Sequence, residues 1–250
     1  MDDKVSIITP LYNLEPFIAA CIESVLNQSY SNFEMIIIDD RSTDSGPEIV
    51  EGFARADSRV RFIKNPSNSG PARTRNRGIE SAEGRYLAFL DGDDIWFPNF
   101  LEKSLETIKA LKCDFVFASY KRFDENLNPL LSDFIVPDKV NYKDLLKSNP
   151  ISCLTAFIDI SKLDKEYMPD VKKRQDYALW LNYLKRTEYA FGIKEPLAIY
   201  RIRSNSLSRN KYSALKYQWK VYREIENLGL ILSCYYIIHW GIRGFLKYRR

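Results

Sequence analysis

The first half of the chain alternates short apolar segments with amphipathic ones, at intervals that leave little room for long loops. Strands are predicted over residues 5–9, 33–38, 60–63, 85–90 and 114–120, and helices over 15–28, 47–56 (capped by Thr43 or Asp44), 70–82 and 97–111. Strands that alternate with helices at this spacing predict an α/β fold with a mainly parallel sheet between layers of helices. In such sheets ligands bind beyond the carboxyl ends of the strands.

The second half is less regular. It predicts a loop or hairpin over 123–140, a strand over 151–160, a helix over 174–186, a late strand over 197–202 and a polar loop over 203–209. No internal repeat or low-complexity segment interrupts it. At 250 residues, the chain can form one large domain or a domain with an appendage.

Acidic residues follow two of the predicted strands. Asp91, Asp93 and Asp94 come directly after one apolar segment, and Asp39 and Asp40 end another. Carboxylates this close raise one another's pKa values unless they share a cation, and oxygen ligands of this kind suit Mg²⁺ or Mn²⁺, which often also hold a diphosphate. A solvated Asp-Gly turn would explain one or two of these acids, but not a second acidic strand end at Asp39 and Asp40. Two clusters at the same edge of a sheet indicate a site.

Residue types that are scarce exclude several kinds of chemistry. His239 is the only histidine and lies in the apolar C-terminal segment, so triads that need a histidine base and histidine-based zinc sites are excluded. The chain contains neither a P-loop nor a Gly-x-Gly-x-x-Gly motif. A hydrolase or transferase built from this sequence would have to work with carboxylates and a metal ion.

The cysteines and the start of the chain bear on its location. The four cysteines form no Cys-x-x-Cys pair, which indicates neither a disulfide framework nor a zinc site. The first residues lack the basic region and apolar run of a secretion signal. We expect a cytoplasmic protein with reduced thiols.

The C-terminal segment is basic and apolar together. Residues 209–250 contain nine Lys or Arg and two Glu, a net charge of +7, and include an apolar run over 228–242. That run is shorter than the roughly 20 residues that span a bilayer. Residues 1–208 are therefore predicted as the main domain and residues 209–250 as an amphipathic helical extension that binds an anionic membrane surface. A helix that docks on the core is the alternative, and no nucleic-acid-binding motif is present.

Five segments in a fixed order resemble the family 2 inverting glycosyltransferases. They cover residues 5–13, 28–44, 70–79, 84–94 and 175–180, and the resemblance extends over roughly residues 4–205. It implies the nucleotide-binding α/β fold called GT-A. Residues 200–209 and 217–222 resemble a bacterial subgroup that contains the teichuronic-acid and O-antigen glycosyltransferases of cell-surface polysaccharide synthesis.

The resemblance implies roles for residues that bind the nucleotide-sugar. Asp40 matches the aspartate that accepts a uracil N–H, Tyr12 the aromatic residue that stacks on the base, and Pro10 a backbone contact. Arg75 lies in the motif that faces the diphosphate, and Arg73 is a looser candidate. A uridine-diphosphate sugar is therefore the implied donor.

The resemblance also implies the metal ligands and the base. Asp91 and Asp93 match an Asp-x-Asp motif, in which the first residue faces the ribose and the metal and the second binds Mn²⁺ or Mg²⁺, while Asp94 closes the turn. Asp176 matches the catalytic base. The family usually has Glu-Asp here, whereas this chain has Gln175-Asp176. On spacing alone, Asp176 would be an ordinary acid in the first turn of a helix.

The function implied is transfer of a hexose or N-acetylhexosamine, with inversion, to a hydroxyl of a lipid-linked glycan, with undecaprenyl diphosphate as the expected lipid. The enzyme would work at the inner face of the cytoplasmic membrane. One alternative is a membrane-peripheral protein that binds nucleotide-sugars without catalysis. The change at Gln175 is the only motif change in that direction, and the intact set of Asp91, Asp93 and Asp176 argues against it. The other is a haloacid-dehalogenase-like phosphatase with Asp91 as nucleophile. That family places its motif on the opening strand, which disfavours this reading.

Overall fold

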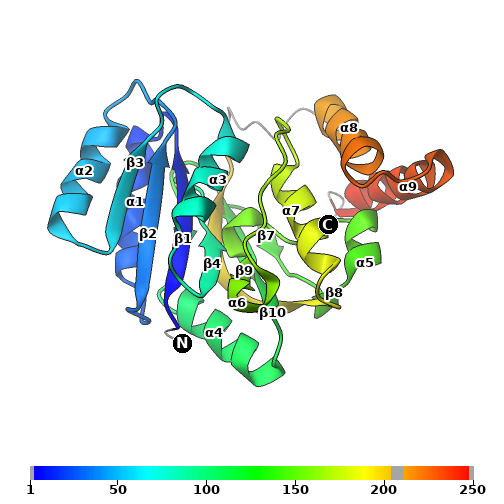
Figure 1. The fold of residues 1–250 in the computed structure, drawn as a ribbon, viewed down its shortest axis with the longest axis horizontal. Coiled ribbons are helices and arrows are strands. Elements are labelled where there is room, and N and C mark those ends of the chain that lie inside the picture. Colours follow the sequence, from blue (N-terminus) through cyan, green and yellow to red (C-terminus); the bar gives the residue numbers. More distant parts are fainter. Residues whose placement is uncertain (1–2, 204–210, 248–250) are drawn as a thin grey trace.

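The structure is a computed structural model, and it describes residues 3–203 and 211–247. Its described strands form one ten-stranded mixed sheet, in which eight strands follow the order β3-β2-β1-β4-β9-β6-β10-β5. Helices cover both faces of this sheet, and the C-terminal helices lie at one end of the molecule (Figure 1).

Four neighbouring parallel strands form the N-terminal part of the sheet. They are Val5–Leu11 (β1), Phe33–Asp39 (β2), Val60–Lys64 (β3) and Tyr86–Phe89 (β4). Val5 of β1 lies opposite Phe33 on one side and Tyr86 on the other. All residues of β2 and β4 are buried, as expected for strands that are covered on both faces.

Two layers of helices complete this part of the fold. On one face, the apolar sides of Glu15–Leu26 (α1), Gly46–Ala56 (α2) and Phe100–Leu111 (α4) share a core with Ile7 and Ile37. On the other face, Pro71–Ser81 (α3) and Gln175–Leu184 (α7) pack over Ile8 and Ile36. Odd and even strand positions thus face different helix layers, which is the period-2 alternation of a strand.

The remaining strands extend the sheet with mixed directions. Phe157–Asp159 (β9) pairs antiparallel with β4 and with Phe115–Phe123 (β6), and Ala190–Arg201 (β10) runs parallel to β6. Three short strands complete it: Ile95–Trp96 (β5), Pro129–Phe134 (β7) and Lys139–Val140 (β8). The carboxyl ends of β1, β2 and β4 therefore meet at one edge, beside the end of β10.

Several sequence predictions for secondary structure were confirmed and others were wrong. Residues 123–140 contain the predicted hairpin, because β7 pairs antiparallel with β6. The strand predicted over 151–160 is instead a 3₁₀ turn, Cys153–Thr155 (η1), the short β9 and the start of a short helix, Ile160–Leu163 (α6). The late strand begins at Ala190, before the predicted residue 197. Ser45 is the N-cap residue of α2, while Asp44 accepts the Gly46 N–H.

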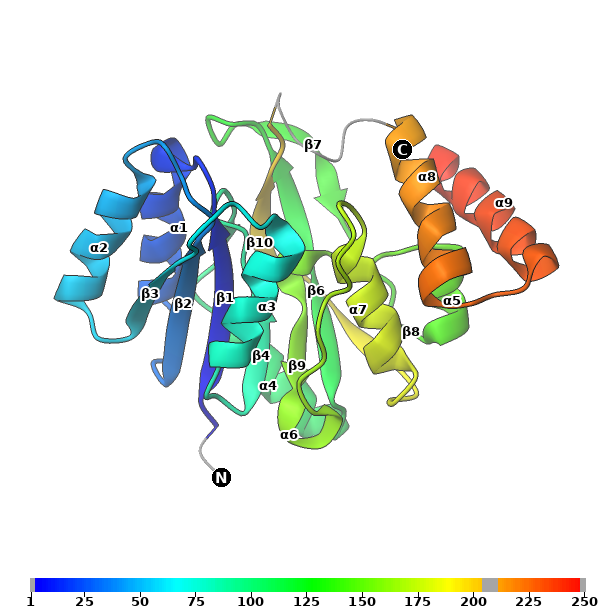
Figure 2. The ribbon, with the colours of Figure 1, turned by 45° about the horizontal axis from the view of Figure 1, so that its top comes forward.

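The C-terminal segment packs on the main domain. Lys211–Lys220 (α8), the π-helical turn Val221–Ile225 (η2) and Leu230–Lys247 (α9) lie beside α7 and Tyr142–Lys147 (α5) (Figure 2). Val221, Tyr222 and Tyr236 are buried in the core, and the Tyr222 hydroxyl donates to the Leu146 carbonyl. The predicted polar loop over 203–209 lies, beyond Arg203, outside the described residues.

Within the described ranges 3–203 and 211–247, no helix has both the length and the apolar character needed to cross a membrane.

Candidate active site

The three acids after β4 form a tight turn at the carboxyl edge of the sheet. The Asp94 N–H donates to the Asp91 carbonyl at 2.9 Å, which closes the turn as expected. The buried Asp94 carboxylate accepts the Arg201 N–H at 2.8 Å, so the turn is fixed to the end of β10. Burial, together with the charges of Asp93 and Asp91, raises the pKa of Asp94 well above its usual value.

Gly92 lets this turn approach β1 closely. A Cβ atom at Gly92 would lie 2.9 Å from the Leu14 side chain and 3.3 Å from the Pro10 carbonyl oxygen. Any larger residue would push the acidic turn away from the end of β1. The predicted contact residue Pro10 and the predicted acids are thus brought together.

Arg75 links the acidic turn to the predicted base. It comes from α3, is nearly buried, and donates through Nη2 to the Asp91 carboxylate. Burial works to lower the pKa of its guanidinium, but the carboxylates of Asp91 and Asp176 contribute to holding that pKa above its usual value. Arg75 Nε is buried and has no hydrogen-bond partner among the described residues. A permanent cation therefore lies close to both predicted carboxylates.

Arg203 is a site residue that the sequence did not indicate. Its Nη1 lies 2.9 Å from Oδ2 of Asp93, and its guanidinium stacks 5.0 Å from the centre of the Phe17 ring. Burial and the charge of Asp91 raise the pKa of Asp93, and Arg203 opposes that shift. The only available signal was the resemblance of residues 200–209 to a bacterial subgroup, which assigned no role to Arg203.

Asp40 holds the loop that begins α3. Its buried carboxylate accepts hydrogen bonds from Asn65 Nδ2 and from the N–H groups of Ser69 and Gly70, each at 2.8 Å. Gly70 has a φ of 81°, which a residue with a side chain adopts at a cost. Asp40 thus joins the end of β2 to the helix that carries Arg75, and the contact with uracil stays a prediction.

Tyr12 follows directly after the last residue of β1, at the carboxyl edge of the sheet. Half of its surface is accessible to solvent, so the ring has room to stack on a planar ligand. The next residue, Asn13, has a φ of 51° and accepts the Thr43 N–H at 2.8 Å, which fixes the backbone beside Tyr12. The backbone beside Tyr12 is therefore held in place, while the ring itself is half exposed.

Arg73 points to a different part of the molecule. Its guanidinium pairs with Asp170, with 2.6 Å between Nη2 and Oδ2, and both side chains are exposed. Its recorded contacts connect α3 to the loop before α7. The structure does not record a contact between Arg73 and the acidic turn.

Asp176 lies in the first turn of α7, on the same side of the sheet as Arg75. The helix is anchored by Trp180, which is fully buried against Phe89 of β4, and by Tyr177, whose hydroxyl donates to the Leu145 carbonyl at 3.2 Å. Gln175 is also buried, and its Oε1 has no partner among the described residues. A rigid helix thus presents the partly exposed Asp176 carboxylate.

The acidic turn offers oxygen ligands for a divalent cation. No cluster of three or more His, Cys, Asp or Glu residues able to hold a metal occurs in the described part of the chain. Mg²⁺ is commonly bound by one or two carboxylates together with substrate phosphates. Asp91 and Asp93 supply two carboxylates on one turn, so these residues fit an ion that is shared with a diphosphate.

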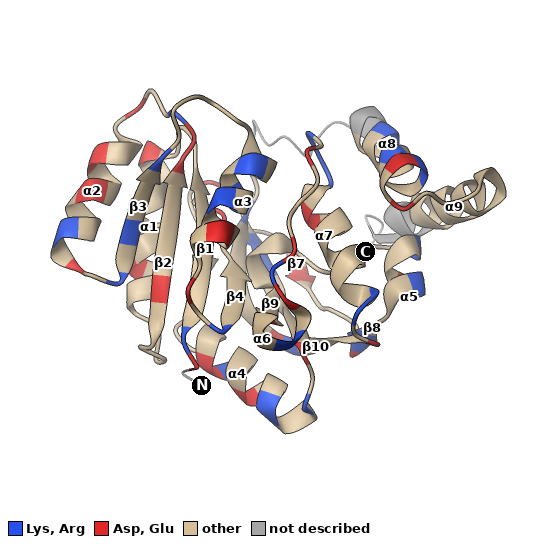
Figure 3. Ribbon diagram, in the orientation of Figure 1, with Lys and Arg blue, Asp and Glu red and all other residues tan. Residues whose placement is uncertain are grey.

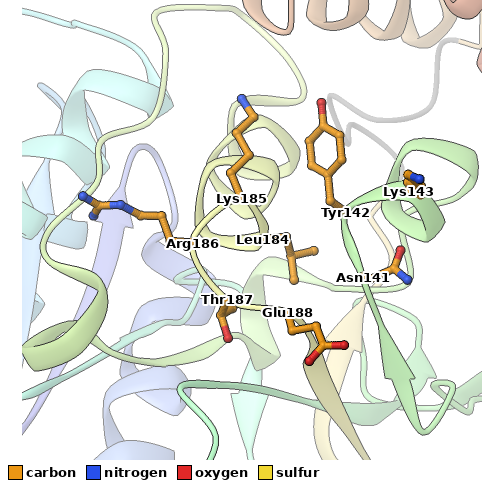
Figure 4. Close-up of a pocket in the computed structure, with 8 residues that line it drawn as sticks. All are labelled: Asn141, Tyr142, Lys143, Leu184, Lys185, Arg186, Thr187 and Glu188. Carbon is orange, nitrogen blue, oxygen red and sulfur yellow. The ribbon is translucent and has the colours of Figure 1, made fainter.

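A separate hollow of about 460 Å³ lies between α5 and the end of α7 (Figure 4). Its lining residues, which include Tyr142, Lys185 and Glu188, contain none of the predicted site residues. The acidic turn therefore remains the candidate active site.

Comparison with known proteins identifies the family. The model of glycosyl transferase family 2 matches residues 6–159, more than half of the chain. The Bacillus subtilis glycosyltransferase TuaG, whose name assigns it to teichuronic acid biosynthesis, is 41% identical over 95% of this chain and 94% of its own. The Escherichia coli protein WfgD, named as a UDP-Glc:α-D-GlcNAc-diphosphoundecaprenol β-1,3-glucosyltransferase, is 38% identical over 99% of this chain and 96% of its own.

A solved structure with the same fold is that of residues 1–349 of S. aureus TarS in complex with UDP-GlcNAc. It superposes with a TM-score of 0.72 at 20% identity, over 88% of this chain and 67% of that one. The fold is therefore GT-A-like, as the sequence predicted. The chain belongs to glycosyl transferase family 2.

Proposed function

We propose that this protein transfers a hexose or N-acetylhexosamine from a UDP-sugar to a hydroxyl of a lipid-linked glycan, with inversion, during cell-surface polysaccharide synthesis. The observation that carries the proposal is the position of Arg75. One buried guanidinium pairs with Asp91 of the acidic turn and lies within electrostatic reach of Asp176. A donor held at the acidic turn would therefore be close to a base on α7.

The residues have separate tasks in this reaction. Asp176 takes the proton of the acceptor hydroxyl as the oxygen attacks the anomeric carbon, on the face opposite the leaving diphosphate. Because there is one displacement, the product has the inverted anomeric configuration. Arg75 and Arg203 supply positive charge beside the diphosphate as the bond to the sugar breaks.

A divalent ion would complete the charge balance. Asp93 and Asp91 would hold Mn²⁺ or Mg²⁺, which acts as a Lewis acid toward the leaving diphosphate. A structure of similar fold, the mannosyltransferase PcManGT of Pyrobaculum calidifontis, contains GDP-Man and Mn²⁺ (TM-score 0.60, 17% identity).

A uridine nucleotide is the proposed donor. Tyr12 would stack on the base, beside the backbone of Pro10, and the Asp40 carboxylate would accept the uracil N–H. Arg73 is a looser candidate for donor binding, because its ion pair with Asp170 would first have to break. The names of WfgD and of the TarS complex contain UDP-Glc and UDP-GlcNAc, respectively, which supports a uridine nucleotide.

The proposed acceptor is a glycan on undecaprenyl diphosphate, the lipid named for the acceptor of WfgD. A protein that acts on such a lipid must reach the inner face of the cytoplasmic membrane. The outer face of α9 suits this, because six of its large apolar side chains are exposed: Leu230, Ile231, Leu232, Tyr235, Ile238 and Ile242. With the net charge of +7 over residues 209–250, this face would bind an anionic membrane.

The proposal is tested by incubating the protein with a panel of UDP-sugars, Mn²⁺ and a GlcNAc-diphosphate lipid analogue. We expect one UDP-sugar to be consumed, and NMR to show an inverted anomeric configuration in the product. We expect EDTA and Asp93→Ala each to abolish donor binding in calorimetry. A retained configuration, or equal affinity for UDP and GDP, would contradict the proposal.

A further inference from the structure

Three consecutive cations precede the proposed base. Lys172, Lys173 and Arg174 lie in the loop that leads into α7, where Figure 3 shows the basic ribbon beside the start of that helix. The nearby acid, Asp170, is engaged by Arg73. In the part of the chain that the structure describes, no acid forms an ion pair with any of the three cations. No described ion pair thus neutralises their positive charge where the acceptor would approach.

Arg174 fixes the position of this cluster. Its backbone is left-handed, with a φ of 67°, although it is not glycine. Its guanidinium lies 5.3 Å from the centre of the Trp240 ring of α9. A cation over an aromatic face is attracted to the ring. The basic loop is therefore held between the base on α7 and the helix with the exposed apolar face.

We propose that Lys172, Lys173 and Arg174 bind the diphosphate of the lipid-linked acceptor. This inference rests on the proposed function. The acceptor sugar would place its hydroxyl at Asp176, its diphosphate would lie against the basic loop, and its lipid chain would leave toward α9. The hydroxyl, the diphosphate and the lipid chain of the acceptor would then meet Asp176, the basic loop and α9, in that order.

The spacing agrees with this arrangement. Arg174 and Asp176 are two residues apart, and two residues of chain span at most about 7 Å. In a single sugar on a diphosphate, such as the GlcNAc-diphosphoundecaprenol named for WfgD, the reacting hydroxyl and the first phosphate are attached to the same sugar ring, so they lie a similar distance apart. A cation cluster much farther from Asp176 could not contact this phosphate while the base contacts the hydroxyl.

The donor has no need of these cations. The donor diphosphate would lie at the acidic turn, where Arg75 and Arg203 already pair with Asp91 and Asp93. A second anionic group is required only if the acceptor carries one. The basic loop is thus assigned to the acceptor.

The test uses two acceptor probes with the same sugar. One is α-D-GlcNAc-diphosphate on a short phenylalkyl chain, and the other is the neutral phenylalkyl glycoside of GlcNAc. We expect Lys172→Ala/Lys173→Ala to raise the KM for the diphosphate probe at least tenfold. The kcat, the KM for the neutral probe and the calorimetric affinity for UDP should hardly change, and Lys172→Arg/Lys173→Arg should restore the low KM.

A matched control removes the same charge elsewhere on this side of the molecule. Lys143 and Lys147 lie on α5, which packs beside α9, with one side chain exposed and the other partly exposed, as for Lys172 and Lys173. Lys143→Ala/Lys147→Ala should leave the KM for both probes unchanged. A similar rise in this control would show a general electrostatic attraction and overturn the inference.

Other results would overturn it as well. An equal rise in KM for the neutral probe would show that the loop does not recognise the diphosphate. Loss of binding to phosphatidylglycerol vesicles with an unchanged KM would assign the loop to lipid headgroups. To separate the inference from the proposed function, binding of the diphosphate probe is also measured by calorimetry with UDP and Mn²⁺ present. Probe binding that needs Lys172 and Lys173 but leads to no transfer would contradict the proposed function alone.

Discussion

The guanidinium of Arg203 pairs with the carboxylate of Asp93, with 2.9 Å between Nη1 and Oδ2. These residues are 110 positions apart in the chain, and the pair joins the end of β10 to the acidic turn after β4. Asp93 is the residue proposed to bind the divalent ion. The pair therefore places an internal cation beside the position where the ion and the diphosphate would be held.

We expect Arg203→Ala to weaken UDP binding in Mn²⁺ about tenfold, because a charge-assisted hydrogen bond to phosphate contributes roughly 1.5–3 kcal/mol and part of this is regained from water. Isothermal titration calorimetry measures the affinity for UDP in the presence of Mn²⁺. Arg203→Lys keeps the charge and should lose less affinity. If Arg203→Ala binds UDP as tightly as the wild type does, then Arg203 acts only as a structural partner of Asp93.

Asp176→Asn should keep donor affinity and lose turnover by roughly 10²–10⁴-fold, the range expected when a general base is removed. The amide keeps the shape of the side chain but cannot take the proton of the acceptor hydroxyl. Steady-state kinetics with a saturating donor, together with calorimetry for UDP, separate the two effects. Near-normal turnover in this variant would exclude Asp176 as the base.

The sequence predicted what depends on local pattern. The apolar runs of β1, β2 and β4 are long enough to identify the strands, and their shared direction predicts that Tyr12, Asp40 and Asp91 follow strand ends at one edge. The strand predicted over 151–160 was wrong, because its apolar residues are buried by packing against the rest of the fold and not by a strand. Cys153–Thr155 is a 3₁₀ turn packed into the core.

Contacts between distant side chains could not be predicted in this way. Nothing in local periodicity indicates that Arg73 pairs with Asp170, or that the Asp40 carboxylate receives the N–H groups of Ser69 and Gly70. These pairings depend on how α3 is placed against the sheet and on the course of the loop before α7. They determine which arginine reaches the acidic turn.

Glu34 gives a prediction about pH and stability. Its carboxylate is buried in β2, where burial alone would raise its pKa, but hydrogen bonds from Ser6 and Arg61 contribute to a net lowering. A lowered pKa in the folded state adds stability that is present above the unfolded pKa of about 4.3 and is lost as the pH falls through the folded value. Glu34→Gln should therefore cost about 2 kcal/mol at pH 7.

Urea unfolding of both proteins at pH 7 and below pH 4 measures this effect. The difference between wild type and Glu34→Gln should shrink at the lower pH, because the wild-type carboxyl then gains its own proton. Glu83→Gln is the matched control, since Glu83 contacts the same Arg61 but is exposed. A difference that stays constant with pH would assign the loss to packing instead of charge.

The outer face of α9 gives a prediction about membranes. Deleting residues 209–250 would also remove Val221 and Tyr222 from the core, so a deletion cannot separate membrane binding from folding. Ile231→Asp/Ile238→Asp changes only exposed side chains and places negative charge on the apolar face. We expect this variant to lose binding to anionic liposomes in a flotation assay, because burial of each isoleucine contributes about 1.5–3 kcal/mol and each basic residue near the surface about 1 kcal/mol.

The same variant should keep the UDP affinity and the unfolding temperature of the wild type, since neither substituted side chain is buried. Higher salt should weaken liposome binding of the wild-type protein without abolishing it, because salt screens the basic residues and leaves the apolar contact. Asn227→Asp, a change at an exposed residue before α9, adds one negative charge without removing an apolar side chain and is the control for charge alone. Full liposome binding by Ile231→Asp/Ile238→Asp would show that α9 does not meet the membrane through this face.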